Sequence, residues 1–349
     1  MVKFLDVVVV AAASSALSAV EGFSAGGGRA HRQSWAPASS TRLCAETDAA
    51  VDQIAEDMLR RKGGDMDESA AFASFAASQS KVVGDITGSI DDLTLETDEV
   101  STSESGFAVD GKTVRLQGGE APGGSNVAWL SDLSVEDRLS SLTVFNGPLT
   151  DVPHLVSRAA IKDGKVNFFL DIRPRAYGAY DLRDKEGNYP GPEELGRKAF
   201  EYSGARKDFD SKFGTEDLVA FLDEMTGKFD GATELPGLDD DGLDEAERAT
   251  RGPLALAYEM PLSDANVDTI NAIREKAASS WLEWSRDDSH SHRPGAPINT
   301  QFVHDTKFRI NAYGALLGAY VSLFGQSEGE RLAASDSGPI DEAYVGGGS

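Results

Sequence analysis

Apolar and polar residues alternate through the middle of the chain, which is the pattern of half-buried β-strands. In residues 166–173 the apolar face of such a strand comprises Val166, Phe168, Leu170 and Ile172. The opposite face is mixed and comprises Asn167, Phe169, Asp171 and Arg173. This mixed face is expected to be either a solvated sheet surface or the wall of a binding site built on a sheet.

Three further segments with strand character precede this one, at residues 125–133, 138–145 and 154–161. The loops between the four segments are too short for crossover helices, so neighbouring strands are predicted to be antiparallel. Residues 107–117 predict a hairpin that turns at an Asp-Gly pair, and the glycine-rich residues 118–124 predict a loop.

Helical patterns follow the predicted sheet. Apolar residues three and four positions apart predict a helix over residues 263–284 and a last helix over residues 305–324. A shorter helix is expected between an N-cap at Thr215 and a glycine stop at Gly227. Residues 253–261 predict one late strand. A sheet followed by helices, one strand and more helices indicates an α+β domain.

The first 45 residues have the composition of targeting signals. Residues 1–22 contain a lysine and a short apolar run, which we interpret as a signal peptide. Residues 23–45 contain three arginines but no acidic residue, which is typical of a transit segment. A two-part leader of this kind predicts delivery to the plastid stroma and a mature chain that begins near Ala45. A plain secretory signal with a flexible spacer is the alternative.

The chain after residue 45 divides into three regions of different composition. Residues 46–106 are acidic and poor in large apolar residues, so they are expected to be mostly flexible apart from a short helix over residues 49–61. The folded domain is predicted to span residues 107–335, with an acidic surface loop at residues 230–252. Residues 336–349 are expected to form a flexible tail.

The charge and the cysteine content restrict the possible partners. With 58 acidic and 33 basic residues, the formal net charge is −25, which disfavours nucleic acid and anionic membrane surfaces. The single cysteine, Cys44, rules out a disulfide framework and thiolate metal sites. The sequence contains no motif for a nicotinamide, flavin, nucleotide or metal, so no bound cofactor and no stable membrane insertion of the mature chain are expected.

One part of this acidic chain is comparatively rich in bases. Residues 158–212 hold twelve basic and ten acidic residues. That balance suits an acidic ligand or an acidic protein partner. Ordinary mixed-charge helix surface is the alternative.

Asp305 is the most suggestive single residue. It shares a helical face with apolar positions, and Arg309, four residues on, can pair with it. At the start of the predicted helix Asp305 would serve as an N-cap; as a partly buried carboxyl with a raised pKa it would instead donate a proton. His154, at the start of a predicted strand, and His304, beside Asp305, are further candidate acids. Asp171 is a further candidate carboxylate.

Three arginines lie on or near adjacent predicted strands. Arg158, Arg173 and Arg175 would each bind a carboxylate bidentately. With Arg309 they make up the predicted substrate-binding residues. The alternative is that they pair with acids of the chain itself: Asp163, Asp171 and Asp181.

Several short motifs follow one another in a particular order: WLSDL at 129–133, DVPHLV at 151–156, FFLDIRPR at 168–175, RGPLALAY at 251–258, WLEW at 281–284 and DTKFR at 305–309. This ordered set resembles red chlorophyll catabolite reductase, a family related to the ferredoxin-dependent bilin reductases. The resemblance implies an α/β/α sandwich with a central antiparallel sheet, and an open-chain tetrapyrrole between the sheet and the C-terminal helices. It also implies that no cofactor is bound, that reduced ferredoxin supplies electrons one at a time, and that protein acids or histidines supply protons.

The resemblance assigns the family's proton-donating carboxylate on the last helix to Asp305. The family's second acid falls on Arg158, which cannot donate a proton at neutral pH. Either His154, His304 or Asp171 then supplies that proton, or the protein binds a tetrapyrrole without reducing it. We therefore expect a plastid ferredoxin-dependent reductase of a linear tetrapyrrole of the chlorophyll-catabolite kind. A non-catalytic pigment carrier or assembly factor is the alternative, and an acidic plastid protein without a pigment is a third possibility.

Overall fold

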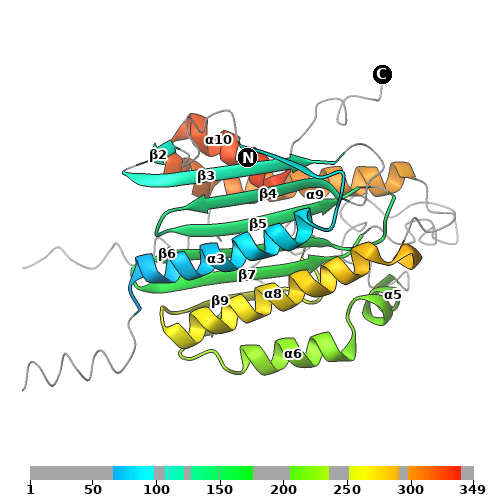
Figure 1. The fold of residues 1–349 in the computed structure, drawn as a ribbon, viewed down its shortest axis with the longest axis horizontal. Coiled ribbons are helices and arrows are strands. Elements are labelled where there is room, and N and C mark those ends of the chain that lie inside the picture. The colour runs from blue at the N-terminus through cyan, green and yellow to red at the C-terminus, as the bar shows by residue number, and fades with distance from the viewer. Residues whose placement is uncertain are drawn as a thin grey trace, which may run out of the picture.

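A nine-stranded antiparallel sheet forms the centre of the protein (Figure 1). In the computed structural model the described residues are 66–97, 107–109, 111–121, 127–147, 149–175, 205–235, 251–290 and 298–338. The strands lie in the order β1-β3-β4-β5-β6-β7-β9-β8, and β2 pairs with β3. Their bounds are β1 Thr94–Thr97, β2 Phe107–Val109, β3 Lys112–Glu120, β4 Val127–Val135, β5 Leu139–Asn146, β6 His154–Lys162, β7 Lys165–Arg173, β8 Thr233–Glu234 and β9 Leu256–Pro261.

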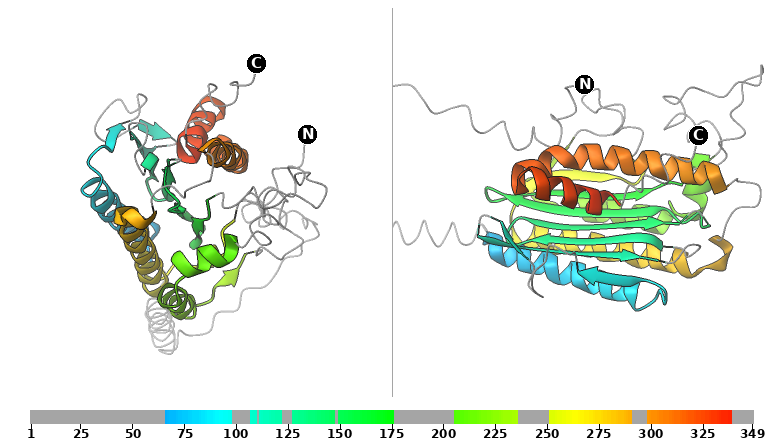
Figure 2. Two further views of the ribbon diagram at one scale, coloured as in Figure 1. Left: turned by 90° about the vertical axis from the view of Figure 1, so that its right-hand side faces the viewer. Right: turned by 90° about the horizontal axis from the view of Figure 1, so that it is seen from above.

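Helices cover both faces of this sheet. Helices α3 and α8 lie on one face, and α9 and α10 lie on the other (Figure 2). This arrangement confirms the predicted α+β fold with an antiparallel sheet between helices. In the described part of the chain, no helix combines the length and apolar character needed to span a membrane. The helices are α3 Glu68–Thr87, α5 Ala205–Lys212, α6 Glu216–Thr226, α8 Asp264–Arg286, α9 Ile298–Phe324 and α10 Gln326–Ser337, with a 3-10 turn η1 at Asp288–His290.

The alternation of side chains divides the apolar residues between two cores. The larger core lies between the sheet and helices α3 and α8, and includes Phe75, Leu142, Phe168, Ile270 and Trp281. The smaller core joins β3, β4 and the start of β5 to α9 and α10, and includes Val114, Leu133, Leu139, Leu316 and Leu332. The smaller core does not extend over the end of β5 or over most of β6 and β7. These strands therefore present mainly polar side chains on the α9 side of the sheet.

Several local predictions are confirmed. The first hairpin consists of β2 and β3, paired antiparallel around Gly111, whose φ of 77° favours glycine. Strands β4 to β7 pair successively and antiparallel. Thr215 caps α6 by accepting a hydrogen bond from the backbone N–H of Leu218, and Gly227 follows the end of that helix. For the hairpin and for α6, the boundary lies at the turn or cap residue that the sequence indicated.

The predicted N-terminal limit of the domain is wrong. Helix α3 lies before residue 107 and buries Ala71, Phe75, Val82 and Ile86 against the sheet and α8. Strand β1 also precedes residue 107 and pairs with β3. The acidic composition of residues 46–106 concealed this single apolar stripe. The leader and the helix expected over residues 49–61 lie outside the described residues.

Four other boundaries also differ. Helix α9 begins at Ile298, so Asp305 lies inside the helix and is not its N-cap. The expected tail from residue 336 begins with two fully buried helical residues, Asp336 and Ser337. Strand β3 extends into the expected glycine loop, where Gly118 is required because a Cβ there would lie 2.6 Å from the Trp129 ring. Strand β8 lies within the expected acidic loop, most of which is outside the described residues.

Candidate functional site

The register of β6 and β7 gathers the predicted site residues on one face of the sheet. His154 lies opposite Arg173, Val156 opposite Asp171, and Arg158 opposite Phe169. Since paired residues point to the same side of an antiparallel sheet, these polar side chains share a face. It is the face covered by α9 and α10, because His154 contacts Asp305 of α9 and Arg158 contacts Asp336 of α10.

Asp305 is held between His154, at the start of β6, and Arg175, which follows the end of β7. Its Oδ1 atom lies 3.1 Å from Nε2 of His154, and its Oδ2 atom accepts a hydrogen bond of 2.7 Å from Nη2 of Arg175. Arg175 also donates to the backbone carbonyls of Asn146 and Gly147, each at 2.8 Å. His154, Arg175 and Asp305 are all buried. We call these three residues the buried trio.

The hydrogen bonds of the buried trio fix the tautomer of His154. The backbone N–H of Asn146 donates to Nδ1 of His154 at 3.0 Å, so Nδ1 carries no proton. The proton of the neutral ring is therefore on Nε2, where it donates to Asp305. Burial, and then the positive charge of Arg175, lower the pKa of His154 from 6.5 to about 3. At neutral pH the trio consequently pairs a neutral imidazole and a guanidinium with one carboxyl group.

Arg158 forms a second cluster around a carboxylate that the sequence analysis did not select. Its Nε donates to Oδ2 of Asp336 at 3.2 Å and to Oγ of Ser141 at 3.1 Å. Asp336 has no solvent exposure. Its carboxylate also accepts hydrogen bonds from hydroxyl groups of Ser131 at 3.3 Å, Ser141 at 2.8 Å, Thr143 at 3.2 Å and Tyr320 at 2.6 Å.

Asp336 places a carboxylate directly beside Arg158. Arg158 is the residue that stands where the resembled family has its second acid. Burial, and then the charge of Asp336, raise the pKa of Tyr320 well above its ordinary value, so Tyr320 remains a donor to Asp336. A signal in the sequence could have identified Asp336. Gly329, Leu332, Ala333 and Asp336 recur at helical spacing and are all buried.

Asp171 and Arg173 form a third cluster. It includes Gly252, which lies shortly before the start of β9. Arg173 Nε donates to Asp171 at 2.6 Å, and the backbone N–H of Gly252 donates to both carboxylate oxygens at 3.0 and 3.2 Å. Burial raises the pKa of Asp171, and the Arg173 guanidinium opposes that shift. This pair matches the alternative that Arg173 binds an acid of the chain itself. Arg175 also binds an acid of the chain itself, Asp305, whereas Asp181 lies outside the described residues.

The remaining candidates lie beside the buried trio on α9. The guanidinium of Arg309 lies 5.2 Å from the centre of the Phe145 ring, and the edge of this ring meets His154 at a centroid distance of 5.0 Å. The Phe145 ring therefore contacts both Arg309 and His154 of the trio. The charge of Arg309 contributes to the lowered pKa of His154. His304 precedes Asp305 in α9, but its side chain lies outside the described part of the structure.

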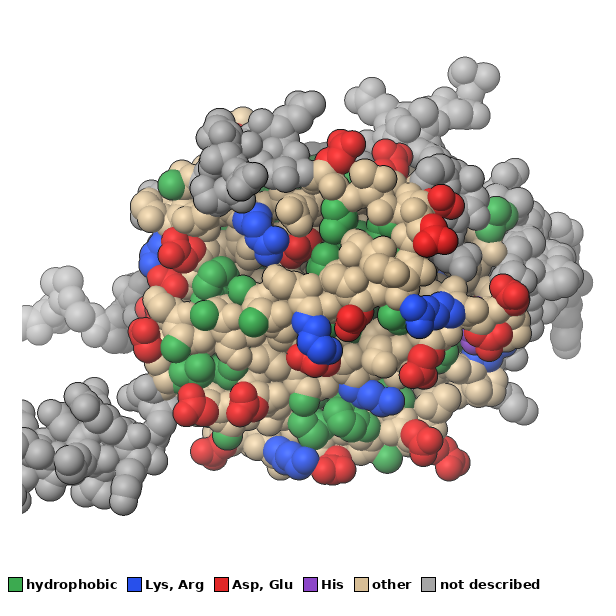
Figure 3. All heavy atoms as spheres, viewed as in Figure 1, with side chains coloured by type: hydrophobic (Ala, Val, Ile, Leu, Met, Phe, Trp, Pro, Cys, Tyr) green, Lys and Arg blue, Asp and Glu red, His purple; other side chains and the backbone are tan. Residues whose placement is uncertain are grey.

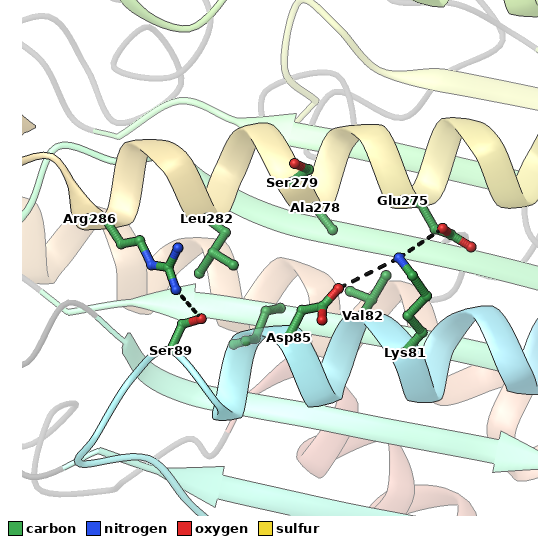
Figure 4. A pocket seen from close by; sticks show the side chains of 10 residues that line it. Lys81, Val82, Asp85, Ser89, Glu275, Ala278, Ser279, Leu282 and Arg286 are labelled. Carbon is green, nitrogen blue, oxygen red and sulfur yellow. Dashed lines mark hydrogen bonds and ion pairs between the residues drawn. The ribbon is translucent and has the colours of Figure 1, made fainter.

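A surface pocket on the other side of the molecule does not include any of these residues. It lies between α3 and α8, where Lys81 bridges Asp85 and Glu275, and Arg286 donates to Ser89 (Figure 4). Its volume of about 270 Å³ is below the range of about 300–1,000 Å³ typical of small-molecule sites. Acidic and basic side chains are interspersed over the surrounding face (Figure 3). Among the described residues, no three His, Cys, Asp or Glu side chains converge in a way that could hold a metal ion.

Known proteins resemble this chain in structure but not in sequence. No family model matches the chain, and no curated protein matches its sequence. Among solved structures, the chain is similar to the selenomethionine form of tomato phytochromobilin synthase in complex with biliverdin. The identity is 13%, the alignment covers 75% of this chain and 83% of the other, and the TM-score is 0.48. A likeness of this degree carries no argument about what the chain binds or does.

Proposed function

We propose that this protein is a plastid ferredoxin-dependent reductase of a linear tetrapyrrole of the chlorophyll-catabolite class. The observation that supports the proposal most is the buried trio, which presents a carboxyl group with defined partners on the sheet face that also carries Arg158 and Arg173. The ordered motifs that resemble red chlorophyll catabolite reductase support the same assignment. The leader in residues 1–45 supports import into the plastid.

The chemistry requires electrons from outside and protons from inside the site. Reduction of one double bond consumes two electrons, which reduced ferredoxin supplies singly, and two protons, which come from solvent through acid groups of the protein. His154 cannot supply a proton as an imidazolium, because its pKa of about 3 keeps it neutral. We therefore assign proton transfer to the carboxyl of Asp305, with His154 and Arg175 positioning its two oxygens.

The proposed reaction does not need an acid at position 158. Asp336 of α10 is in contact with Arg158, on the side of the sheet that α10 covers. In this proposal Arg158, held by Asp336, contributes positive charge for the carboxylates of a tetrapyrrole. His304 and Asp171 remain proposed sources of a further proton.

A pigment carrier with the same fold is the second candidate function. It is favoured by one observation: Asp171, Asp305 and Asp336 each form an ion pair with an arginine. An arginine partner stabilises the ionised carboxylate and so disfavours the protonated form that donates. Such a protein would bind the pigment on the same face and release it unchanged.

An anaerobic assay separates these functions. The purified protein is incubated with reduced ferredoxin and either biliverdin or red chlorophyll catabolite, and the absorption spectrum of the pigment is recorded. A reductase consumes the pigment band and forms a product with a new spectrum. Saturable binding without product formation supports the carrier and overturns the reductase. A fusion of residues 1–45 to a fluorescent protein tests the plastid assignment separately.

A further inference from the structure

We propose that Phe169, with Arg173 and Arg251, forms a platform that binds a planar ligand bearing carboxylates. The three residues are called the Phe169 platform below. The identity of the ligand as an open-chain tetrapyrrole rests on the proposed function. The platform itself rests on the positions of these side chains.

Two guanidinium groups lie close to the same aromatic ring. The Cζ atom of Arg251 is 5.5 Å from the centre of the Phe169 ring, and that of Arg173 is 5.9 Å away. Both distances are within the range of cation–π interactions. Phe169 is only half-buried, and its register partner on β6 is Arg158. Positive charge therefore surrounds a ring that retains some exposure to solvent.

A buried carboxylate sets the position of both arginines. Asp171 has no solvent exposure, and it binds Arg173 and the backbone N–H of Gly252 together. Gly252 lies so close to β7 that an added Cβ would be 2.4 Å from the carbonyl oxygen of Ile172. Its contact with Asp171 fixes the backbone next to Arg251. Asp171 is therefore a positioning residue for the platform.

The composition of the platform indicates the class of ligand. Guanidinium groups match carboxylates with paired hydrogen bonds, and an aromatic ring stacks against a flat conjugated system. Burial lowers the pKa of Arg173 and the Asp171 carboxylate opposes that shift, while the charges of Arg158 and Arg251 add to the lowering. The two guanidinium groups beside the Phe169 ring suit a ligand that carries carboxylates. A conjugated tetrapyrrole with propionate groups has both properties.

A binding titration with two forms of one pigment tests the platform. Biliverdin and its dimethyl ester share the conjugated system and differ in the two carboxylates. Affinities are measured by absorbance for the wild type, Arg251→Gln, Arg251→Lys and Phe169→Leu. Arg286→Gln, on the other side of the sheet, is the matched control.

We expect Arg251→Gln to weaken binding of the diacid about tenfold while binding of the ester changes little. Arg251→Lys should recover part of the loss, since it keeps the charge without the fork. Phe169→Leu should weaken the diacid and the ester alike, and Arg286→Gln should match the wild type. Thermal unfolding of each variant verifies that it is folded.

Two results would overturn the platform. If the wild type binds biliverdin but Arg251→Gln keeps the full preference for the diacid over the ester, the platform is wrong while the proposed function stands. If the folded wild type binds no linear tetrapyrrole, the proposed function and the ligand class fail together.

Discussion

The Nε2–H of His154 donates to Oδ1 of Asp305. This hydrogen bond links strand β6 to helix α9, between residues that are 151 positions apart in the sequence. The assignment is directional because the backbone N–H of Asn146 occupies Nδ1 of the same ring. Asp305 thus has one oxygen bound by a neutral imidazole and the other by Arg175. A carboxyl fixed in this manner has a defined orientation toward the sheet face.

Replacement of Asp305 by asparagine should abolish turnover and preserve pigment binding. Asparagine keeps an oxygen acceptor and the size of the side chain but cannot carry the transferred proton. We expect the reduction rate to fall by about 10²–10⁴-fold, measured per folded molecule in the anaerobic assay. Asp217→Asn, on the exposed side of α6, is the matched control. An active Asp305→Asn enzyme would remove Asp305 from proton transfer.

His154 should make the stability of the protein depend on pH. Its pKa is about 3 in the folded protein, against 6.5 for an unperturbed histidine, so the unfolded chain takes up a proton first as pH falls. The stabilising contribution is complete above pH 6.5 and is lost progressively as pH falls toward 3. Between pH 7 and pH 5 this corresponds to about 2 kcal/mol.

Urea unfolding at both pH values measures this effect. The variant His154→Gln lacks the titrating group, so the free energy of unfolding should fall less steeply with pH than in the wild type. Identical pH slopes for the two proteins would show that His154 is not buried in its neutral form.

Separating Arg158 from Asp336 should destabilise the protein more than replacing both. Asp336→Leu leaves a largely buried guanidinium without its carboxylate, which typically costs about 3–5 kcal/mol. The double variant Arg158→Met/Asp336→Leu removes both charges and should recover much of the loss. A double-mutant cycle of chemical denaturation measures the coupling free energy. Additive losses would show that the pair is not coupled.

Gly252→Ala should disturb the site through the backbone. The added Cβ would meet the carbonyl oxygen of Ile172 at 2.4 Å, so the segment must shift, at a cost of about 1–3 kcal/mol. The shift also moves Arg251, and pigment binding should weaken. Gly314→Ala on α9, where nothing lies within 4 Å of an added Cβ, is the control and should be neutral or slightly stabilising. Equal stability of both variants would contradict the close approach at Gly252.

The sequence predicted the elements that carry regular local signals. Strands β4 to β7 alternate strictly enough to be found, and the Thr215 cap and the Gly111 turn have side-chain and backbone requirements that are visible locally. Helix α3 was missed although its buried stripe includes Phe75, Val82 and Ile86, because the acidic composition of residues 46–106 as a whole outweighed this local apolar spacing. Propensity and composition do not reveal that such a stripe will be covered by α8.

The site was predicted in part, for a similar reason. His154, Arg175 and Asp305 were each selected, but no spacing in the chain indicates that they meet. Asp336 was placed in a tail because a carboxylate among small residues suggests exposure, whereas the hydroxyls that satisfy it come from β4, β5 and α9. Such long-range pairing is a property of the tertiary structure.

The most direct test of the central claim is the anaerobic spectrum of a linear tetrapyrrole mixed with this protein and reduced ferredoxin. The account predicts loss of the pigment band and formation of a reduced product only when both proteins are present, and no product with Asp305→Asn. An unchanged spectrum with biliverdin and with red chlorophyll catabolite, for a folded wild-type protein, would contradict it.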